Sequence, residues 1–183
     1  MTSVDPSERS DHAVLRAVAG AFEDAWNQRD AQGVADVFTE DAVMEDPGAP
    51  EAVLRGRSAI RAYFESWLRA FPDAQMRQDV LFTPLDGGEY ASRWRIWGTM
   101  EQDLQPPGFA ATHQRVETEG VAIIELRGSL VSRCRQFYDT TQVARQLGAA
   151  PPRGSRLERL GVMAQRLSVA LKSRTGRSRT RRG

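Results

Sequence analysis

Apolar residues recur at helical spacing in the first part of the chain. Residues 12–28 place them at intervals of three and four, typical of an amphipathic helix, and the stripe is Leu15, Val18, Ala19, Phe22 and Trp26. Asp30 is a good N-cap for a short helix over residues 31–38, and Ser58 for a third helix over residues 58–70. The first half is therefore predicted to be mainly helical.

The period changes to two in the second half, where alternation is typical of strands. We expect strands over residues 41–46, 75–84, 89–100, 114–126 and 130–139. Asp86-Gly87-Gly88 and Arg127-Gly128-Ser129 supply turns between neighbours. Helices followed by a meander of antiparallel strands predict an α+β domain, in which one curved sheet wraps three helices.

The net charge of +1 hides two regions of opposite charge. Residues 151–183 hold ten of the 25 basic residues and one of the 24 acids, which leaves 15 basic and 23 acidic residues before them. The body is therefore about −8 and the tail +9, joined at Ala149-Ala150-Pro151-Pro152. We expect a disordered N-terminus over residues 1–11, one domain over residues 12–150 and a basic extension over residues 151–183.

Several chemistries have no support in the sequence. A single cysteine, Cys134, excludes an internal disulfide, and the two histidines, His12 and His113, show no metal-ligand spacing. Phosphate-binding and dinucleotide-binding glycine motifs are missing. No cofactor or metal is therefore expected. No apolar run is long enough to span a membrane and the N-terminus lacks an apolar signal core, so a cytoplasmic protein is expected.

Asp139 ends the last predicted strand directly after Phe137 and Tyr138, and a helical segment closing on Gly148 follows. A carboxylate beside aromatics is costly unless it is paired or functional. It could cap the helix that starts at Thr140, or it could face an apolar pocket and act as an acid or base.

The chain resembles the SnoaL-like branch of the nuclear transport factor 2-like superfamily, which includes polyketide cyclases and limonene-epoxide-hydrolase-like enzymes. The resemblance covers roughly residues 12–148 and rests on segments starting at Trp26, Phe38, Asp46, Arg55, Pro106, Tyr138 and Gln146. It implies a cone-shaped sheet whose concave side, capped by helices, encloses an apolar pocket.

The resemblance implies three catalytic positions. Asp139 matches the family's catalytic carboxylate, and Arg93 matches an arginine of the epoxide hydrolases. Asp46 stands where those hydrolases place a water-holding asparagine, or it simply starts an Asp-Pro turn. Arg95 replaces a family aspartate and Met44 a tyrosine, which counts against ordinary epoxide hydrolysis.

A further set would line the pocket if Asp139 points inward: Arg95, Trp97, Phe137, Met44, Trp67 and Tyr63. Two alternatives stay open. Trp94 and Ile96 could face inward with both arginines in solvent, and the helical aromatics could be ordinary core. Cys134 is expected to pack on the face opposite Asp139.

The tail is predicted to form a helix over about residues 155–172 and to be disordered after it. The helix has arginines beside an apolar stripe formed by Leu157, Leu160, Met163 or Ala164, Leu167 and Leu171. A basic amphipathic helix suits an anionic membrane surface or an acidic partner, although a solvated extension without a role is equally compatible. Because the tail has no aromatic to stack on bases, specific nucleic-acid binding is not expected.

The sequence therefore favours an enzyme that performs acid/base chemistry of the cyclase or isomerase type on an apolar, oxygenated small molecule. The alternative is a non-catalytic domain that binds a ligand or forms dimers. The resemblance also implies a homodimer through the outer sheet face, with Trp94, Ile96 and Tyr138 as contact residues.

Overall fold

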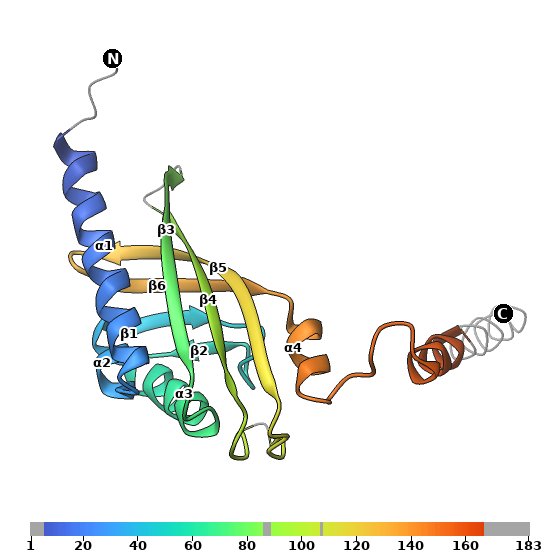
Figure 1. The fold of residues 1–183 in the computed structure, drawn as a ribbon. Helices are drawn as coiled ribbons and strands as arrows, with labels where there is room; N and C mark the ends of the chain where they lie inside the picture. Colours follow the sequence, from blue (N-terminus) through green and yellow to red (C-terminus); the bar gives the residue numbers. More distant parts are fainter. Residues whose placement is uncertain (1–5, 86–88, 107, 167–183) are drawn as a thin grey trace, which may run out of the picture.

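Six strands form one curved, unclosed sheet in the computed structural model (Figure 1), which describes residues 6–85, 89–106 and 108–166. The strands are β1 (Phe38–Glu45), β2 (Val53–Arg55), β3 (Gln75–Leu85), β4 (Glu89–Thr99), β5 (Arg115–Arg127) and β6 (Leu130–Tyr138). Their order across the sheet is β2-β1-β6-β5-β4-β3. The pair β1–β6 is parallel and the other four pairs are antiparallel.

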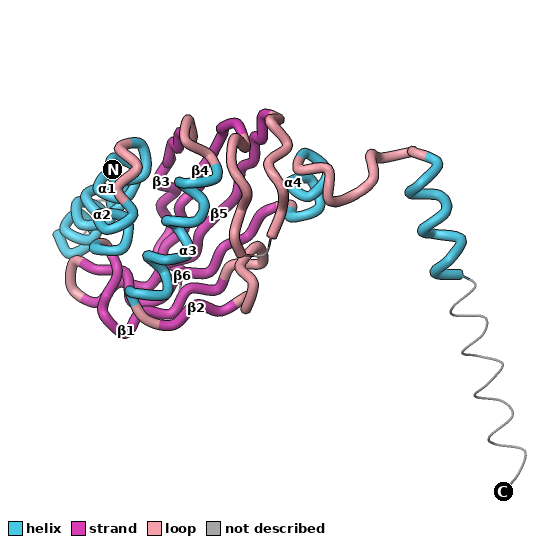
Figure 2. Tube along the Cα trace, turned by 90° about the horizontal axis from the view of Figure 1, so that it is seen from below, coloured by secondary structure: helices cyan, strands magenta, loops and turns pink. Residues whose placement is uncertain are grey.

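Four helices accompany the sheet: α1 (Pro6–Asn27), α2 (Ala31–Asp36), α3 (Arg57–Ala70) and α4 (Thr140–Gln146). Helices α1–α3 lie together along one side of the sheet, whereas α4 lies apart from them, beyond the end of β6 (Figures 1 and 2). The core forms where the helical aromatics meet the inward side chains of the sheet, among them Trp26, Phe64, Trp94 and Cys134. The α+β architecture with a curved sheet around three helices is therefore confirmed.

Side chains at the end of α1 fix this helix against β3. The Asn27 amide donates to the Met76 carbonyl at 3.1 Å, and its oxygen accepts from the Met76 N–H at 2.8 Å. Glu23 accepts from the Gln78 N–H at 2.7 Å. These bonds satisfy backbone groups at the free edge of β3, which an edge strand otherwise leaves open.

Several boundaries differ from the prediction. Helix α1 starts at Pro6. Residues 6–11 are therefore helical, whereas the sequence predicted disorder there. Helix α3 starts at Arg57 after Gly56, whose φ of 81° suits glycine, and Ser58 is not its cap. The short strand β2 was not predicted, because three residues carry no readable alternation. The proposed Asp86-Gly87-Gly88 turn lies outside the described residues.

The inward and outward faces of β4 and β6 are the reverse of those expected for a pocket around Asp139. In β4, Ser92 and Trp94 are buried, whereas Arg93 and Arg95 are exposed and pair with Glu119 on β5, each at 3.6 Å. In β6, Cys134 is buried and Phe137 is 55% exposed. Because successive side chains alternate, an error of one residue inverts a whole strand.

The residues named for a dimer contact are affected by the same inversion. Trp94, Ile96 and Tyr138 point into the domain and line its cavity. They therefore cannot form an outer contact face.

Gly120 on β5 makes room for the Trp94 indole. A Cβ at this position would lie 2.4 Å from Trp94 Cζ2 and 2.6 Å from the Phe137 carbonyl oxygen. We expect Gly120→Ala to lower the free energy of unfolding by roughly 1–3 kcal/mol, because overpacking forces neighbours from their rotamers. Urea denaturation measures the change. Gly20→Ala is the matched control, because nothing lies within 4 Å of its new Cβ in an exposed helix, and it should stabilise by about 0.5–1 kcal/mol. Equal effects at the two sites would contradict the packing account.

Candidate functional site

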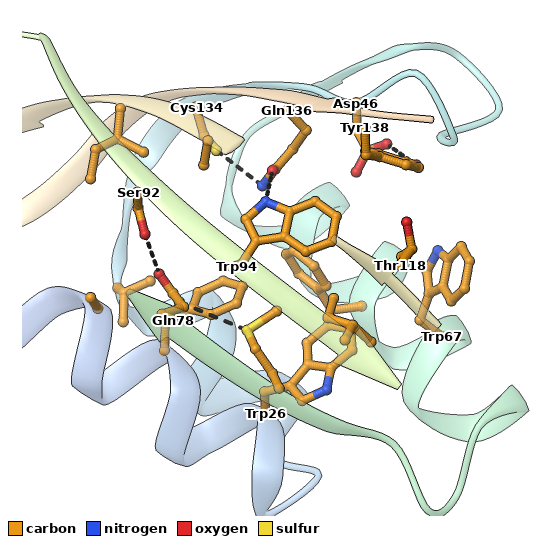
Figure 3. Close-up of a pocket in the computed structure, with 18 of the residues that line it drawn as sticks. Trp26, Asp46, Trp67, Gln78, Ser92, Trp94, Thr118, Cys134, Gln136 and Tyr138 are labelled. Atoms are coloured by element: carbon orange, nitrogen blue, oxygen red, sulfur yellow. Dashed lines mark hydrogen bonds between the residues drawn. The ribbon is translucent and has the colours of Figure 1, made fainter. Parts of the chain in front are cut away.

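A cavity of about 120 Å³ lies between the helices and the concave face of the sheet (Figure 3). Its volume is comparable to the roughly 150 Å³ engineered cavity that binds benzene. The wall is mostly apolar and aromatic, and includes Phe22, Trp26, Phe64, Trp67, Trp94 and Ile96. The cavity therefore suits a compact apolar group of about the size of one ring.

Asp46 is the one ionisable carboxylate in this wall among the described residues, and no arginine, lysine or histidine of the described chain lines it. The residue is only 6% exposed. It follows β1 directly, and its Oδ1 accepts the Gly48 N–H at 2.8 Å, which is the expected Asp-Pro-Gly turn. Asp46 is thus a turn residue and a cavity residue at once.

Tyr138 donates its hydroxyl to the same carboxylate. The distance from Tyr138 Oη to Asp46 Oδ1 is 2.8 Å, and Figure 3 shows the two side chains meeting at the cavity wall. Gly48 permits this approach, because a Cβ there would lie 2.1 Å from Tyr138 Oη. The Gly48 and Tyr138 bonds both go to Oδ1, so Oδ2 takes neither of them.

Tyr63 on α3 extends the array. Its side chain lies close enough to Asp46 to influence the pKa of that carboxyl, and it also neighbours Trp67, one turn further along the helix. The carboxylate is therefore held by the Gly48 N–H and the Tyr138 hydroxyl, with the Tyr63 side chain beside it. These neighbours come from a turn, a strand and a helix.

Burial raises the pKa of Asp46, although hydrogen bonds from Gly48, Tyr138 and Tyr63 oppose the increase. The same burial, together with the nearby Asp46 charge, raises the pKa values of Tyr63 and Tyr138. Both phenols therefore stay protonated and act as hydrogen-bond donors. A carboxyl whose pKa is raised by burial is suited to take up and return a proton.

Asp139 does not face the cavity, so the expectation of a pocket carboxylate there is wrong. Its side chain is 47% exposed, its Oδ1 accepts the Gln142 N–H at 2.8 Å, and its Oδ2 lies 3.7 Å from an Arg153 nitrogen. The alternative reading, an N-cap of α4, is the observed one. Strand alternation puts Asp139 on the outward side because Tyr138 points inward.

The other predicted residues divide in the same way. Arg93, Arg95, Trp97 and Phe137 lie outside the cavity wall, for the reason of strand parity given above. Met44 is fully buried in the core and does not line the cavity. Tyr63, Trp67 and Asp46 do line it. The structure therefore groups Asp46 with two aromatics from α3 and separates it from Asp139 and Arg93.

Two hydrogen-bonded pairs of polar side chains in the wall were missed. Trp94 Nε1 donates to Gln136 Oε1 at 2.8 Å, and Ser92 Oγ donates to Gln78 Oε1 at 2.8 Å. Because Trp94 can only donate, the Gln136 oxygen is committed and its NH₂ group points elsewhere, 3.4 Å from the Cys134 sulfur. The alternation of Ser92, Trp94 and Ile96 with arginines was the available signal for the inward face of β4.

Cys134 is fully buried, and burial together with the Asp46 charge raises the pKa of its thiol to about 12. A thiol with so high a pKa is a poor nucleophile at neutral pH. Within the described residues, no group of histidine, cysteine and carboxylate side chains could hold a metal ion. The chemistry of the site therefore rests on Asp46 and its hydroxyl and amide neighbours.

Comparison with known proteins agrees with this fold. Residues 18–134 match the SnoaL-like domain. The chain belongs to the SnoaL-like family. No curated protein matches the sequence. In this SnoaL-like chain, no helix of the described residues is long and apolar enough to cross a membrane.

Solved structures of similar fold come from several sources. TsrD from Streptomyces laurentii is 19% identical, with a TM-score of 0.63 over 81% of this chain and 100% of its own. A candidate polyketide cyclase from Xanthomonas campestris pv. campestris is 19% identical, with a TM-score of 0.61, and the match covers 74% of this chain and 97% of the cyclase. SalBIII, an epoxide hydrolase/cyclase-like enzyme with a role in pyran ring formation in salinomycin, is 24% identical, with a TM-score of 0.57. The match covers 72% of this chain and 95% of SalBIII. At these identities the likeness shows the shared fold alone.

Asp46→Asn should stabilise the SnoaL-like domain in a pH-dependent way. Below about pH 4 the carboxyl is protonated in both the folded and unfolded states. Above that, the folded state keeps a proton that the unfolded state has lost, so wild-type stability falls as pH rises through the raised pKa. Asparagine does not titrate and still accepts through its oxygen. The difference in Tm between variant and wild type should therefore grow from acid to neutral pH. A difference that stays constant or shrinks would contradict the burial account.

Proposed function

We propose that the protein is an enzyme that moves a proton on a compact, apolar, oxygenated molecule, in the manner of a cyclase or isomerase, with Asp46 as its acid/base group. The observation that carries the proposal is the single carboxylate, held by the Tyr138 hydroxyl, in a mostly apolar wall. A buried carboxyl left uncompensated by any cation is costly to stability, which is common where a residue serves function.

The proposed step is proton abstraction beside a carbonyl. The ionised Asp46 takes the proton from the carbon beside the carbonyl. The C–H electron pair becomes the C=C bond of an enolate, and the π electrons of the C=O bond move onto its oxygen.

 The proton then rests on Asp46 Oδ2, and its return to another carbon of the enolate restores the ionised carboxylate and completes an isomerisation. Attack of the enolate carbon on a second carbonyl would instead close a ring. Both outcomes balance without an oxidant, a reductant or a cofactor.

Neutral donors are the groups that would stabilise the enolate oxygen. Tyr138 and Gln136 occupy alternate positions on the inward face of β6, so their side chains lie next to one another along the strand. The Gln136 NH₂ group has only the Cys134 sulfur as a partner among the described residues. A sulfur acceptor is weak, so this amide can be given to a substrate oxygen at little cost. The arginines once expected in this role lie on the outer face.

The proposal is tested by proton exchange in deuterated water, which needs no knowledge of the natural substrate. Cyclic ketones and 1,3-diketones of one-ring size are incubated with the protein, and loss of the α-proton signal is followed by NMR. We expect the wild type to accelerate exchange, and Asp46→Asn to reduce the rate by about 10²–10⁴-fold because the general base is lost.

Asp139→Asn is the matched control, because asparagine caps helices as well as aspartate does and the side chain lies outside the cavity. Its exchange rate should stay within about twofold of the wild type. Equal rates for the wild type and Asp46→Asn would overturn the proposal. Ketone binding without exchange would assign the cavity to a binding domain.

The exchange rate should also follow the ionisation of Asp46. Because burial raises the pKa of this carboxyl, the rate should rise with pH through a midpoint above the ordinary aspartate value of about 3.9. A pH–rate profile of the wild type measures the midpoint. A midpoint at or below the ordinary value would contradict an uncompensated buried base.

A further inference from the structure

The C-terminal helix, residues 156–166, exposes an unusual amount of apolar surface. Five large apolar side chains of the described chain are exposed, and four of them lie on this helix: Leu157, Leu160, Val162 and Met163. Figures 1 and 2 show the helix projecting from the domain beyond α4. An apolar cluster outside the core marks a contact surface for something other than water.

Three of these side chains share one face. At about 100° per residue, Leu157, Leu160 and Met163 fall within an arc of about 120°, and Val162 lies on the opposite side. The exposed fractions of the three are 67%, 57% and 58%. By the same geometry, Arg156 at the start of the helix falls within the arc, and Arg159 and Arg166 border it on one side. The helix is therefore amphipathic, with its apolar face turned to solvent.

The start of the helix is attached to the domain by specific contacts. Ser155 Oγ accepts the Glu158 N–H at 3.1 Å, which caps the helix. Glu158 pairs with Arg145 of α4 at 3.2 Å, and Arg153 lies 3.7 Å from Asp139. Asp139 thus contacts the segment that leads into the projecting helix and does not serve as the pocket carboxylate that the sequence suggested.

These contacts also leave the arginines of the helix unneutralised. Glu158 is the one acid in residues 151–183, and Arg145 already engages it. Among the described residues, no carboxylate forms an ion pair with Arg156, Arg159 or Arg166. The extension keeps the charge of +9 that its sequence gives, against −8 for residues 1–150.

We propose that this helix docks the protein on the surface of an anionic lipid bilayer, with Leu157, Leu160 and Met163 entering the interface and the arginines meeting the headgroups. The exposed leucines suit the apolar acyl region of such a surface, and the arginines without an ion-pair partner suit its anionic headgroups. No helix of the described residues is long and apolar enough to cross a membrane. The one-sided placement of leucines and arginines suits a helix that lies on the bilayer surface.

The combination favours a bilayer over other partners with negative charge. A nucleic acid would meet the arginines and leave the leucines without a contact, and the extension has no aromatic side chain to stack on bases. The acidic body of a second copy would likewise satisfy the charge alone, because its described surface exposes Phe137 as its one large apolar side chain.

Vesicle sedimentation with the full chain tests the proposal. Vesicles of phosphatidylglycerol mixed with phosphatidylcholine should bind the protein, and vesicles of phosphatidylcholine alone should bind it much less. Raising the salt concentration should release it, because salt screens the arginines. Leu160→Gln should weaken binding by about tenfold through lost apolar burial.

Val162→Gln is the matched control, since it makes a similar change on the opposite face of the same helix and should alter binding by less than about twofold. Circular dichroism checks that both variants keep their helix content. An equal loss of vesicle binding in the two variants, or no loss in either, would contradict docking through the face that carries Leu160. Failure to bind anionic vesicles would overturn the proposal, whether the protein instead binds RNA or self-associates through Leu160. None of these outcomes depends on chemistry at Asp46.

Discussion

The parallel pairing of β1 with β6 is the constraint that brings the site together. Parallel strands end at the same edge of a sheet, and here Glu45 lies opposite Arg135 in register. The residue after β1 is Asp46 and the last residue of β6 is Tyr138, so the hydroxyl and the carboxylate meet at that edge. Every other strand pair is antiparallel. A shift of one residue in this single pair would separate the two groups.

Much of the fold could be predicted from the sequence because the hydrophobic periods are clear. The stripe from Leu15 to Trp26 gave α1, and Asp30 caps α2 through the Gly33 N–H as expected. The alternation in β4 also indicated the correct inward face, because the buried Trp94 lies between the exposed Arg93 and Arg95. Matching Arg93 and Asp139 to positions in related enzymes pointed to the opposite face. The alternation within the strand follows from the energetic cost of burying a guanidinium group. Matching single residues to positions in related enzymes takes no account of that cost.

The site could be predicted only in part. Asp46 was a candidate, but the sequence could not show that Tyr138 and Tyr63 would reach it, since the three residues belong to a turn, a strand and a helix far apart in the chain. The space that Gly48 leaves for Tyr138 depends on the same tertiary contact. Asp139 satisfied both sequence arguments for a catalytic carboxylate and nevertheless serves as a helix cap. Its partner Arg153 lies in the extension, across the proline pair that joins the two regions.

Cys134 gives the protein an internal reporter. It is the one cysteine of the chain, it lines the cavity, and its sulfur lies 3.4 Å from the Gln136 amide nitrogen. A thiol reagent in solution can reach it only when the helices and sheet part locally, so the labelling rate counts those openings against a background free of other thiols. The labelling rate of Cys134 therefore reports how often the domain opens locally, and a ligand bound in the cavity should slow this labelling.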